Sequence, residues 1–360
     1  MDITIEDKRP NGPIVKVIGV GGGGSNAVER MIASGMTGVE FITLNTDAWA
    51  LRDSSANMRI QIGENITGGH GTGGKPELGR EAAENDIESI REVIKDSDIL
   101  FIAAGLGRGT GTGAAPLIAR EAAALGALTI GVVTKPFNFE GRKLQARADA
   151  AIDALEEFTD TLLLIPNQKL FSIIGRDAPS EQAISKADDV LSQAVRCISD
   201  IISRRNQKML INVDFADLRE VIKNSGGAIM GIGSASGRNR AVNAAEKAIN
   251  SPLLDDVSIS GSSGIIVNIR GSSSITLGEV DEAVSRVRES AAPYADIFFG
   301  LAYDPEVDEE EIKITVIATG CSRKNRQLLL RGMRDSSAPR RITPEKFPAY
   351  MRDNLKRKNK

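Results

Sequence analysis

The 360-residue chain contains 41% hydrophobic and 26% charged residues, and its formal net charge is −3. This composition indicates an ordinary soluble globular protein, and no run of about 18 apolar residues predicts a membrane span. The acidic, polar start MDITIEDKRPNG is unlike a signal peptide. Cys197 and Cys321 are too few for a disulfide framework and lack metal-ligand spacing, so we expect a cytoplasmic protein.

The charge is divided unevenly along the chain. Residues 321–360 contain 13 Lys and Arg against three acidic residues, so this segment carries +10 and residues 1–320 carry −13. Such a basic segment is suited to nucleic acid, an anionic membrane surface or an acidic protein face. A solvated tail is the alternative.

The first half alternates short β-branched segments with segments of helical spacing. The expected strands are 14–20, 39–45, 58–63, 98–105, 128–134 and 161–167, and the expected helices are 25–35, 76–96, 114–126 and 141–158. This alternation predicts a doubly wound, mostly parallel α/β sheet. Ligands of such sheets bind beyond the carboxyl ends of the strands.

The second half predicts a long helix followed by a smaller α+β domain. Apolar residues recur every three or four positions from about Ser180 to Arg205. The expected strands are then 209–214, 264–271, 296–304 and 311–320, and the expected helices are 216–226, 240–250 and 276–292. Two domains suit a chain longer than the roughly 250–300 residues at which single cores stop growing.

Glycine-rich segments follow the first, third and fourth expected strands. They read GVGGGGSNAV (19–28), NITGGHGTGGKPELG (65–79) and GLGRGTGTGAAP (105–116). Glycine lets backbone N–H groups wrap a phosphate at a helix start. Gly19, Gly21 and Gly24 also match the dinucleotide pattern G-x-G-x-x-G, and Asp47 lies near enough to hold a ribose. Three loops at one sheet edge favour a triphosphate over a dinucleotide, which generally needs one.

The segment GLGRGTGTGAAP resembles the signature loop of the tubulin and FtsZ family. Further family landmarks stand in order: FITLNTD (41–47), TKPFNFEG (134–141), LIPN (164–167), ADDVLSQAV (187–195) and INVDFADLREV (211–221). The resemblance implies a cytoplasmic GTPase that polymerises head to tail into protofilaments of the division ring at midcell. The alternative is an FtsZ-like structural or regulatory protein with weak or no hydrolysis that modulates another FtsZ.

The resemblance also implies a division of the chain into parts. These are a flexible N-terminus (1–13), a GTP-binding domain (14–179), a central helix (180–206), a C-terminal GTPase-activating domain (207–320), a linker (321–344) and a basic adaptor-binding peptide (345–360).

The resemblance implies a nucleotide site for GTP or GDP. The α and β phosphates would face Gly22, Gly23 and Asn26, and Gly109, Thr110 and Gly111 would close over them. Gly73 and Gly74 would lie by the γ phosphate, and Asn45 would lie near the nucleotide. Glu140 would bind the ribose, and Asn167 and Asp188 would bind guanine. The carboxylate of Asp188 would accept from N1–H and the exocyclic amine. Mg²⁺ would bridge phosphate oxygens largely through waters, so no protein metal ligand is expected.

The resemblance places the hydrolytic residues on the other domain. Asn212, Asp214 and Asp217 would reach the γ phosphate of GTP that the neighbouring subunit holds. Phosphoryl transfer needs an oriented water, and Asp214 and Asp217, three apart at a helix start, can share one face and hold it. The alternative is that these acids only complement the helix dipole.

Four positions depart from the family pattern. Arg108 replaces a glycine, Lys75 an asparagine, Leu144 an arginine and Ile184 the phenylalanine that stacks on guanine. In one reading, positive charges at 75, 108, 142 and 143 compensate for the arginine lost at 144. In a second, Arg108 needs a backbone conformation that glycine supplies, or fills phosphate space. In a third, its side chain projects to solvent or to a neighbouring subunit.

The C-terminal end TPEKFPAYMRDNLKRKNK (343–360) resembles the FtsZ peptide that docks onto membrane-anchoring adaptors. A short helix would present Phe347, Tyr350 and Met351 to a hydrophobic groove, while Arg352 adds electrostatic attraction. Membrane contact would then be indirect, and no nucleic acid partner is expected. An unstructured basic end is the alternative.

Overall fold

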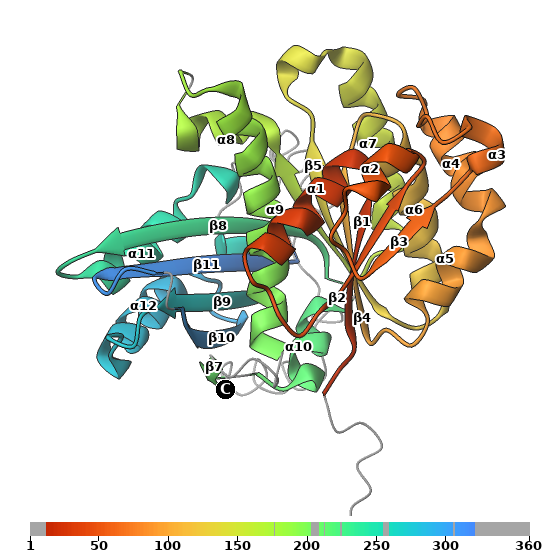
Figure 1. Cartoon of the computed structure of the whole chain (residues 1–360). Helices are drawn as coiled ribbons and strands as arrows, with labels where there is room; N and C mark the ends of the chain where they lie inside the picture. The colour runs from red at the N-terminus through yellow and green to blue at the C-terminus, as the bar shows by residue number, and fades with distance from the viewer. Residues whose placement is uncertain are drawn as a thin grey trace, which may run out of the picture. The chain divides into compact units, whose positions relative to one another are not determined.

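A computed structural model of the chain describes residues 12–175, 177–202, 209–211, 213–223, 225–254, 259–304 and 307–320. Within these residues one 11-stranded sheet runs in the order β3-β2-β1-β4-β5-β6-β8-β11-β9-β10-β7 (Figure 1). The predicted α/β and α+β regions therefore share a continuous sheet, joined where β6 pairs with β8 in parallel.

The N-terminal half of the sheet is parallel throughout. Its strands are β1 (Val15–Val20), β2 (Glu40–Asn45), β3 (Met58–Gln61), β4 (Ile99–Gly105), β5 (Leu128–Lys135) and β6 (Thr161–Pro166). The intervening helices are α1 (Gly21–Ala33), α2 (Ala48–Arg52), α3 (Glu64–Thr67), α4 (Pro76–Asn85), α5 (Ile87–Ile94), α6 (Thr110–Ala124), η1 (Asn138–Glu140), α7 (Arg142–Glu156) and α8 (Asn167–Ile174). Because all six strands point the same way, the three glycine-rich segments gather at one edge.

Helices cover both faces of this half. Alternate residues of β1 separate the two cores: Val15 and Val17 pack with α1, α8 and α9 (Ser180–Ile202), while Ile18 and Val20 pack with α4 to α7. Period-two alternation of this kind is what a strand buried on both faces requires. The predicted doubly wound architecture is confirmed.

The C-terminal half is mixed rather than parallel. It contains β7 (Met209–Ile211), α10 (Phe215–Ile222), β8 (Gly226–Ser236), α11 (Arg240–Ile249), η2 (Pro252–Leu254), η3 (Ile259–Gly261), β9 (Gly264–Gly271), α12 (Leu277–Ser290), β10 (Asp296–Tyr303) and β11 (Glu311–Thr319). β11 pairs antiparallel with β8 and β9, and helices α11 and α12 cover the face opposite α9.

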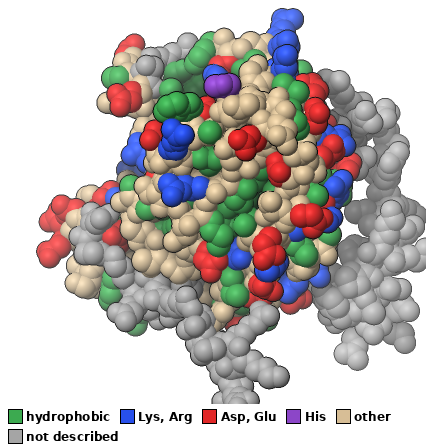
Figure 2. Space-filling model, turned by 45° about the vertical axis from the view of Figure 1, so that its right-hand side comes forward, with side chains coloured by type: hydrophobic (Ala, Val, Ile, Leu, Met, Phe, Trp, Pro, Cys, Tyr) green, Lys and Arg blue, Asp and Glu red, His purple; other side chains and the backbone are tan. Residues whose placement is uncertain are grey.

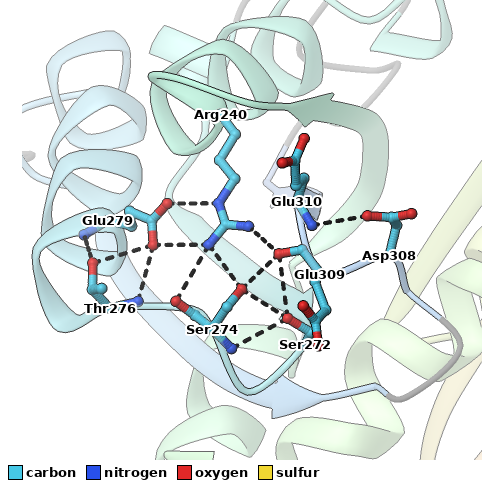
Figure 3. Close-up of polar contacts among 8 residues, drawn as sticks. All are labelled: Arg240, Ser272, Ser274, Thr276, Glu279, Asp308, Glu309 and Glu310. Atoms are coloured by element: carbon cyan, nitrogen blue, oxygen red, sulfur yellow. Dashed lines mark hydrogen bonds and ion pairs between the residues drawn. The ribbon is translucent and has the colours of Figure 1, made fainter.

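A buried arginine fastens the C-terminal half together (Figure 3). Arg240, 8% exposed, binds Glu279 with Nε–Oε1 at 2.6 Å and donates through Nη1 to Glu309 O at 2.5 Å. Its Nη2 reaches Ser274 Oγ at 3.1 Å. The hydrogen bonds from Arg240 and Thr276 lower the pKa of Glu279 although its partial burial opposes the shift. One side chain thus joins α11, α12 and the loop before β11.

Several elements differ from the sequence expectation. The expected helix 76–96 is two helices, because the chain turns at Asp86, whose Oδ2 accepts from Gly63 N at 2.6 Å. Strand β8 and helix α8 were not expected at all. The expected helix from Ser180 ends at Ile202 within the described part, and Arg205 lies outside it.

Charges of both signs are interspersed on the surface that carries α3, α4 and α5. Figure 2 shows described acidic and basic side chains alternating there with apolar and uncharged ones. The excess of acidic residues in the body is therefore not gathered into one field on this surface. Among the described residues, no helix is both long and apolar enough to cross a membrane.

Candidate functional site

Three helices begin at the glycine-rich edge without a capping side chain. No side chain accepts a hydrogen bond from the first turn of α1, α4 or α6, whereas Asp47 caps α2 and Thr276 caps α12. The first turns of α1 and α6 also lack acidic residues. Uncapped helix starts leave backbone N–H donors and the positive dipole end available to an anion. Their convergence indicates an anion site of high charge.

Glycines let the three helix starts approach one another. A Cβ on Gly21 would lie 2.8 Å from Gly111 N, which brings α1 against α6. A Cβ on Gly113 would lie 2.1 Å from Pro76 O, which brings α6 against α4. Gly109 is packed so closely that its Cβ would lie 1.7 Å from Thr72 Oγ1. These positions need glycine because neighbouring atoms, backbone at Gly21 and Gly113 and the Thr72 side chain at Gly109, occupy the space of a Cβ.

Other glycines face open space instead of protein. Gly22 is exposed, and a Cβ on it would meet no atom within 4 Å. The same holds for the Cβ positions of Gly73 and Gly74, whose φ angles are +57° and +73°. Gly23 and Asn26 are likewise exposed on the first turns of α1. Gly22, Gly23, Asn26, Gly73 and Gly74 therefore border an open space, whereas the predicted contacts Gly109, Thr110 and Gly111 are buried.

Buried hydroxyl and amide groups hold the loop backbones behind this space. Thr46 Oγ1 and Thr110 Oγ1 are 2.7 Å apart and link the end of β2 to the start of α6. Thr112 Oγ1 accepts from Gly107 N at 2.9 Å. Asn45 is 4% exposed, and its Oδ1 accepts from Thr46 N at 2.9 Å. Asn45 thus positions the loop, and its Oδ1 is already used by the backbone.

The predicted ribose carboxylate is held by its own turn. Glu140 Oε1 accepts from Phe137 N at 3.0 Å, and Oε2 lies 3.4 Å from Arg108 Nη2. The Arg108 side chain is 80% exposed, so this ion pair is weak.

The backbone of Arg108 is not in the left-handed region. Among the described non-glycine residues, only Asp96 and Asn239 have a positive φ. The reading in which Arg108 needs the backbone freedom of glycine is therefore wrong.

The predicted base-binding end contains one unsatisfied acceptor and one carboxyl group whose charged form is disfavoured by burial. Asn167 Oδ1 is buried without a hydrogen-bond partner, as an acceptor reserved for a ligand would be. Burial raises the pKa of Asp188 to about 7, Arg30 opposes the rise and Asp189 adds to it. Ile184 is 57% exposed, so an apolar surface is available where the family has an aromatic ring.

Comparison with known proteins identifies this arrangement. Residues 14–175 match the model of the tubulin/FtsZ family GTPase domain, and residues 226–322 match that of the FtsZ family C-terminal domain. A cell division protein FtsZ from Pseudomonas putida is 50% identical over 314 residues, which cover 87% of this chain and 78% of that protein. The chain belongs to the FtsZ family. Its N-terminal half is the family's GTPase domain.

Solved structures agree with the family assignment. An empty FtsZ dimer from M. jannaschii has a TM-score of 0.82 at 40% identity, covering 86% of this chain and 88% of that one. CetZ2 from Haloferax volcanii, in a GTPγS-bound protofilament, has a TM-score of 0.71 at 20% identity, covering 89% and 98%. The second likeness shows the fold alone. The match to the family's GTPase domain implies that this chain binds GTP or GDP.

The expected hydrolytic residues lie far from the phosphate loops of this FtsZ-family chain. Asp214 and Asp217 are exposed at the start of α10, and Asn212 lies outside the described residues. Val213 N donates to Ile201 O at 3.3 Å, near the end of α9. Asp188 lies 13 residues earlier on α9, about 20 Å away at 1.5 Å per residue. Figure 1 accordingly shows α10 low in the picture and α2 near the top.

Helix α7 holds site contacts that sequence reasoning missed. Arg147 Nη1 donates to Gly74 O at 2.6 Å, and Gln145 Nε2 donates to Pro136 O at 2.7 Å. Leu144, a departure from the family pattern, packs beside Gly107, whose Cβ would lie 3.3 Å from Leu144 Cβ. No motif marks these residues, because their partners are backbone atoms of distant loops. Lys75, also a departure, is exposed just before α4.

Proposed function

We propose that the chain hydrolyses GTP at the contact between successive copies of itself, within head-to-tail protofilaments of a division ring. The observation that supports this most strongly is the separation of the two half-sites. The phosphate loops gather at the carboxyl ends of the parallel strands, while Asp214 and Asp217 lie near the far end of α9. A second copy stacked in the same orientation would bring its acids onto the first copy's GTP.

Head-to-tail stacking is the geometry that such a separation requires. A contact between two different faces of identical subunits is heterologous and continues into a filament unless it closes as a ring. Thr161, the first residue of β6, donates through Oγ1 to Ile222 O at 3.0 Å. The last residue of α10 therefore lies at the amino ends of the parallel strands. The two half-sites thus lie toward opposite edges of one sheet.

Within the site, the role of each group follows from its chemistry. Backbone N–H groups of Gly22, Gly23, Gly109 and the 73–74 loop would bind phosphate oxygens, and the dipoles of α1, α4 and α6 would stabilise their charge. Asp188 and Asn167 would read guanine, and Glu140 would accept from a ribose hydroxyl. Asp214 and Asp217 of the next copy would orient the attacking water.

The donor set also fits a bound Mg²⁺. The described residues contain no cluster of three or more His, Cys, Asp or Glu that could hold a metal. Mg²⁺ commonly keeps several waters and binds through substrate phosphate oxygens, so the nucleotide itself would supply its ligands. The ion would supply charge neutralisation between phosphate oxygens, and the protein would hold it through the nucleotide.

A mixing experiment tests catalysis between copies. Asp217→Ala keeps the nucleotide site, and Gly109→Ala keeps the acids while its new Cβ would lie 1.7 Å from Thr72 Oγ1. Each variant alone should release phosphate slowly. In an equal mixture, the nucleotide site of an Asp217→Ala subunit meets the acids of a Gly109→Ala subunit in up to about one contact in four, and only these contacts have both half-sites intact. Absence of recovery, with both variants folded and present in one pellet, would refute catalysis between copies.

A protein with weak hydrolysis that modulates another FtsZ is the second candidate. The contact between Arg108 and Glu140 is the observation that favours it, because this exposed, weak ion pair competes with the ribose for the same carboxylate. GTP-dependent pelleting with phosphate release by this chain alone supports the first candidate. Pelleting without phosphate release supports the second.

The C-terminal peptide is the proposed attachment to adaptors at the membrane of the midcell division site. Phe347, Tyr350, Met351 and Arg352 lie outside the described residues, so the proposal depends on the sequence pattern alone. A synthetic peptide of residues 343–360 should bind a membrane adaptor through its apolar residues. Binding that survives Phe347→Ala with Tyr350→Ala, but disappears in high salt, would indicate a purely electrostatic tail.

A further inference from the structure

Helix α7 contacts three separate segments of the nucleotide site. Gln145 donates to Pro136 O at 2.7 Å and to Phe137 O at 3.2 Å, on the segment that leads to Glu140. One residue earlier, Leu144 packs against Gly107 of the signature loop. Two residues later, Arg147 binds Gly74 of the loop expected at the γ phosphate. A single helix thus connects the ribose, signature and γ-phosphate segments.

The Gly73–Gly74 loop is a tight turn closed by one backbone hydrogen bond, from Lys75 N to Thr72 O at 3.2 Å. Both glycines have left-handed φ angles, and no atom lies within 4 Å of either Cβ position. Glycine has more backbone freedom to lose than any other residue, so an external contact adds to the order that this one hydrogen bond provides. Thr72 fixes the preceding residue by packing against Gly109. At the glycines themselves, the contact is the 2.6 Å hydrogen bond from Arg147 to Gly74 O.

The direction of this bond matters for an anion site. A backbone carbonyl turned toward a phosphate would repel it, whereas a carbonyl bound by a guanidinium on α7 is held away. Arg147 also lines a groove of about 490 Å³ together with Pro76 and Thr112. These two residues belong to the start of α4 and the first turn of α6, so the guanidinium lies beside both phosphate segments.

We propose that Arg147 is a positioning residue for the γ-phosphate loop, and that it replaces, one helical turn later, the guanidinium that Leu144 does not supply. It turns Gly74 O toward α7 and leaves the N–H groups of the loop for the γ phosphate. The proposal rests on the proposed function, since it needs GTP in this site. Because the loop touches only the γ phosphate, Arg147 strengthens binding of GTP over GDP.

The test measures the ratio of GTP to GDP affinity on the full chain by equilibrium competition. Arg147→Ala should weaken GTP binding by about tenfold or more, the loss expected for a charge-assisted hydrogen bond, and GDP binding by less than about twofold. Arg147→Lys, which keeps the charge and one donor, should lose less. Arg286→Ala is the matched control, because this arginine pairs with Glu246 and Glu289 on the C-terminal half of the chain, away from the groove that Arg147 lines.

A second variant tests whether one arginine replaces the other. Adding Leu144→Arg to Arg147→Ala should restore at least part of the lost preference for GTP. Equal weakening of GTP and GDP, or an unchanged ratio in folded Arg147→Ala protein, would overturn the positioning role. Failure of the double variant to recover would overturn the replacement. If the unaltered chain binds neither nucleotide, the proposed function itself fails, which is a different result.

Discussion

The carboxyl group of Asp188 should make guanine recognition depend on pH, and Asp188→Asn should remove that dependence. Guanine presents two donors, N1–H and the exocyclic amine, which only the ionised carboxylate can accept together. Burial raises the pKa of Asp188 to about 7, the nearby Arg30 opposes this rise, and Asp189 reinforces it. The group is therefore largely protonated in the free protein at pH 6.

The magnitude follows from the fraction of ionised carboxyl. With a pKa near 7, about one molecule in eleven is ionised at pH 6 and about ten in eleven at pH 8. GTP affinity should therefore fall by about tenfold from pH 8 to pH 6, and binding should release about half a proton at pH 7 and nearly one at pH 6. Because the folded pKa is raised, ionisation of Asp188 also destabilises the nucleotide-free fold as pH rises from about 4 through 7.

Calorimetry in buffers of different ionisation enthalpy measures the released proton directly. Asp188→Asn should release none at this position, and its remaining pH dependence reports titration of the phosphates. An asparagine amide can donate to the second carbonyl of xanthine, so the variant should lose GTP affinity by about 100-fold at pH 8 and gain affinity for XTP. Equal pH dependence in both proteins, or no gain for XTP, would refute the assignment of Asp188 to guanine.

Three further substitutions have outcomes that the packing determines. Gly113→Ala places a Cβ 2.1 Å from Pro76 O and should lower the free energy of unfolding in urea by about 1–3 kcal/mol, whereas no loss would mean that α4 and α6 can separate freely. Arg240→Ala leaves Glu279 half-buried without its partner and should cost about 3–5 kcal/mol at pH 7. The pKa of Glu279 is lowered in the fold, so its contribution is present above its unfolded pKa and is lost on acidification; the Arg240→Ala penalty should shrink below about pH 4. Arg108→Gly should change GTP affinity by less than about fivefold, because its ion pair with Glu140 is solvent-exposed, and a larger change in competition binding would mean a direct phosphate contact.

Much of the fold was predictable because its periodicity is local. Each strand of the parallel half is a short apolar run, and the glycine-rich segments after them were correctly expected at one edge. Strand β8 escaped notice because GGAIMGIGSAS contains glycines where a strand normally has side chains. Gly231 and Gly233 are needed there, since a Cβ on either would lie within about 2 Å of a carbonyl oxygen on α11. Such a requirement comes from a distant helix and leaves no local signal.

The site was predictable only in part, for a similar reason. The phosphate loops can be recognised in the sequence because only glycine fits where the backbones pack too closely for a Cβ, and this leaves several glycines in a short segment. Arg147 and Gln145 were not recognised, because an arginine or glutamine on a helix is ordinarily a solvated residue and their partners are carbonyls of other segments. The unsatisfied Oδ1 of Asn167 and the raised pKa of Asp188 at the base end depend on burial that only the packed structure defines.

The uncapped helices connect the nucleotide to both stability and assembly. Side-chain caps at α1, α4 and α6 would each stabilise the free protein by roughly 1 kcal/mol. They are missing, as they are at α5, α7, α8, α10 and α11, but these three helix starts lie together where an anion can take the place of a cap. A bound triphosphate would satisfy these helix starts at once, and at a hundred times its dissociation constant would stabilise the fold by about 2.7 kcal/mol. If the next copy's Asp217 removes the γ phosphate, the first loop to lose its ligand is the one that Arg147 holds. Hydrolysis would then loosen the surface on which that copy sits, because the loop forms part of the same open edge.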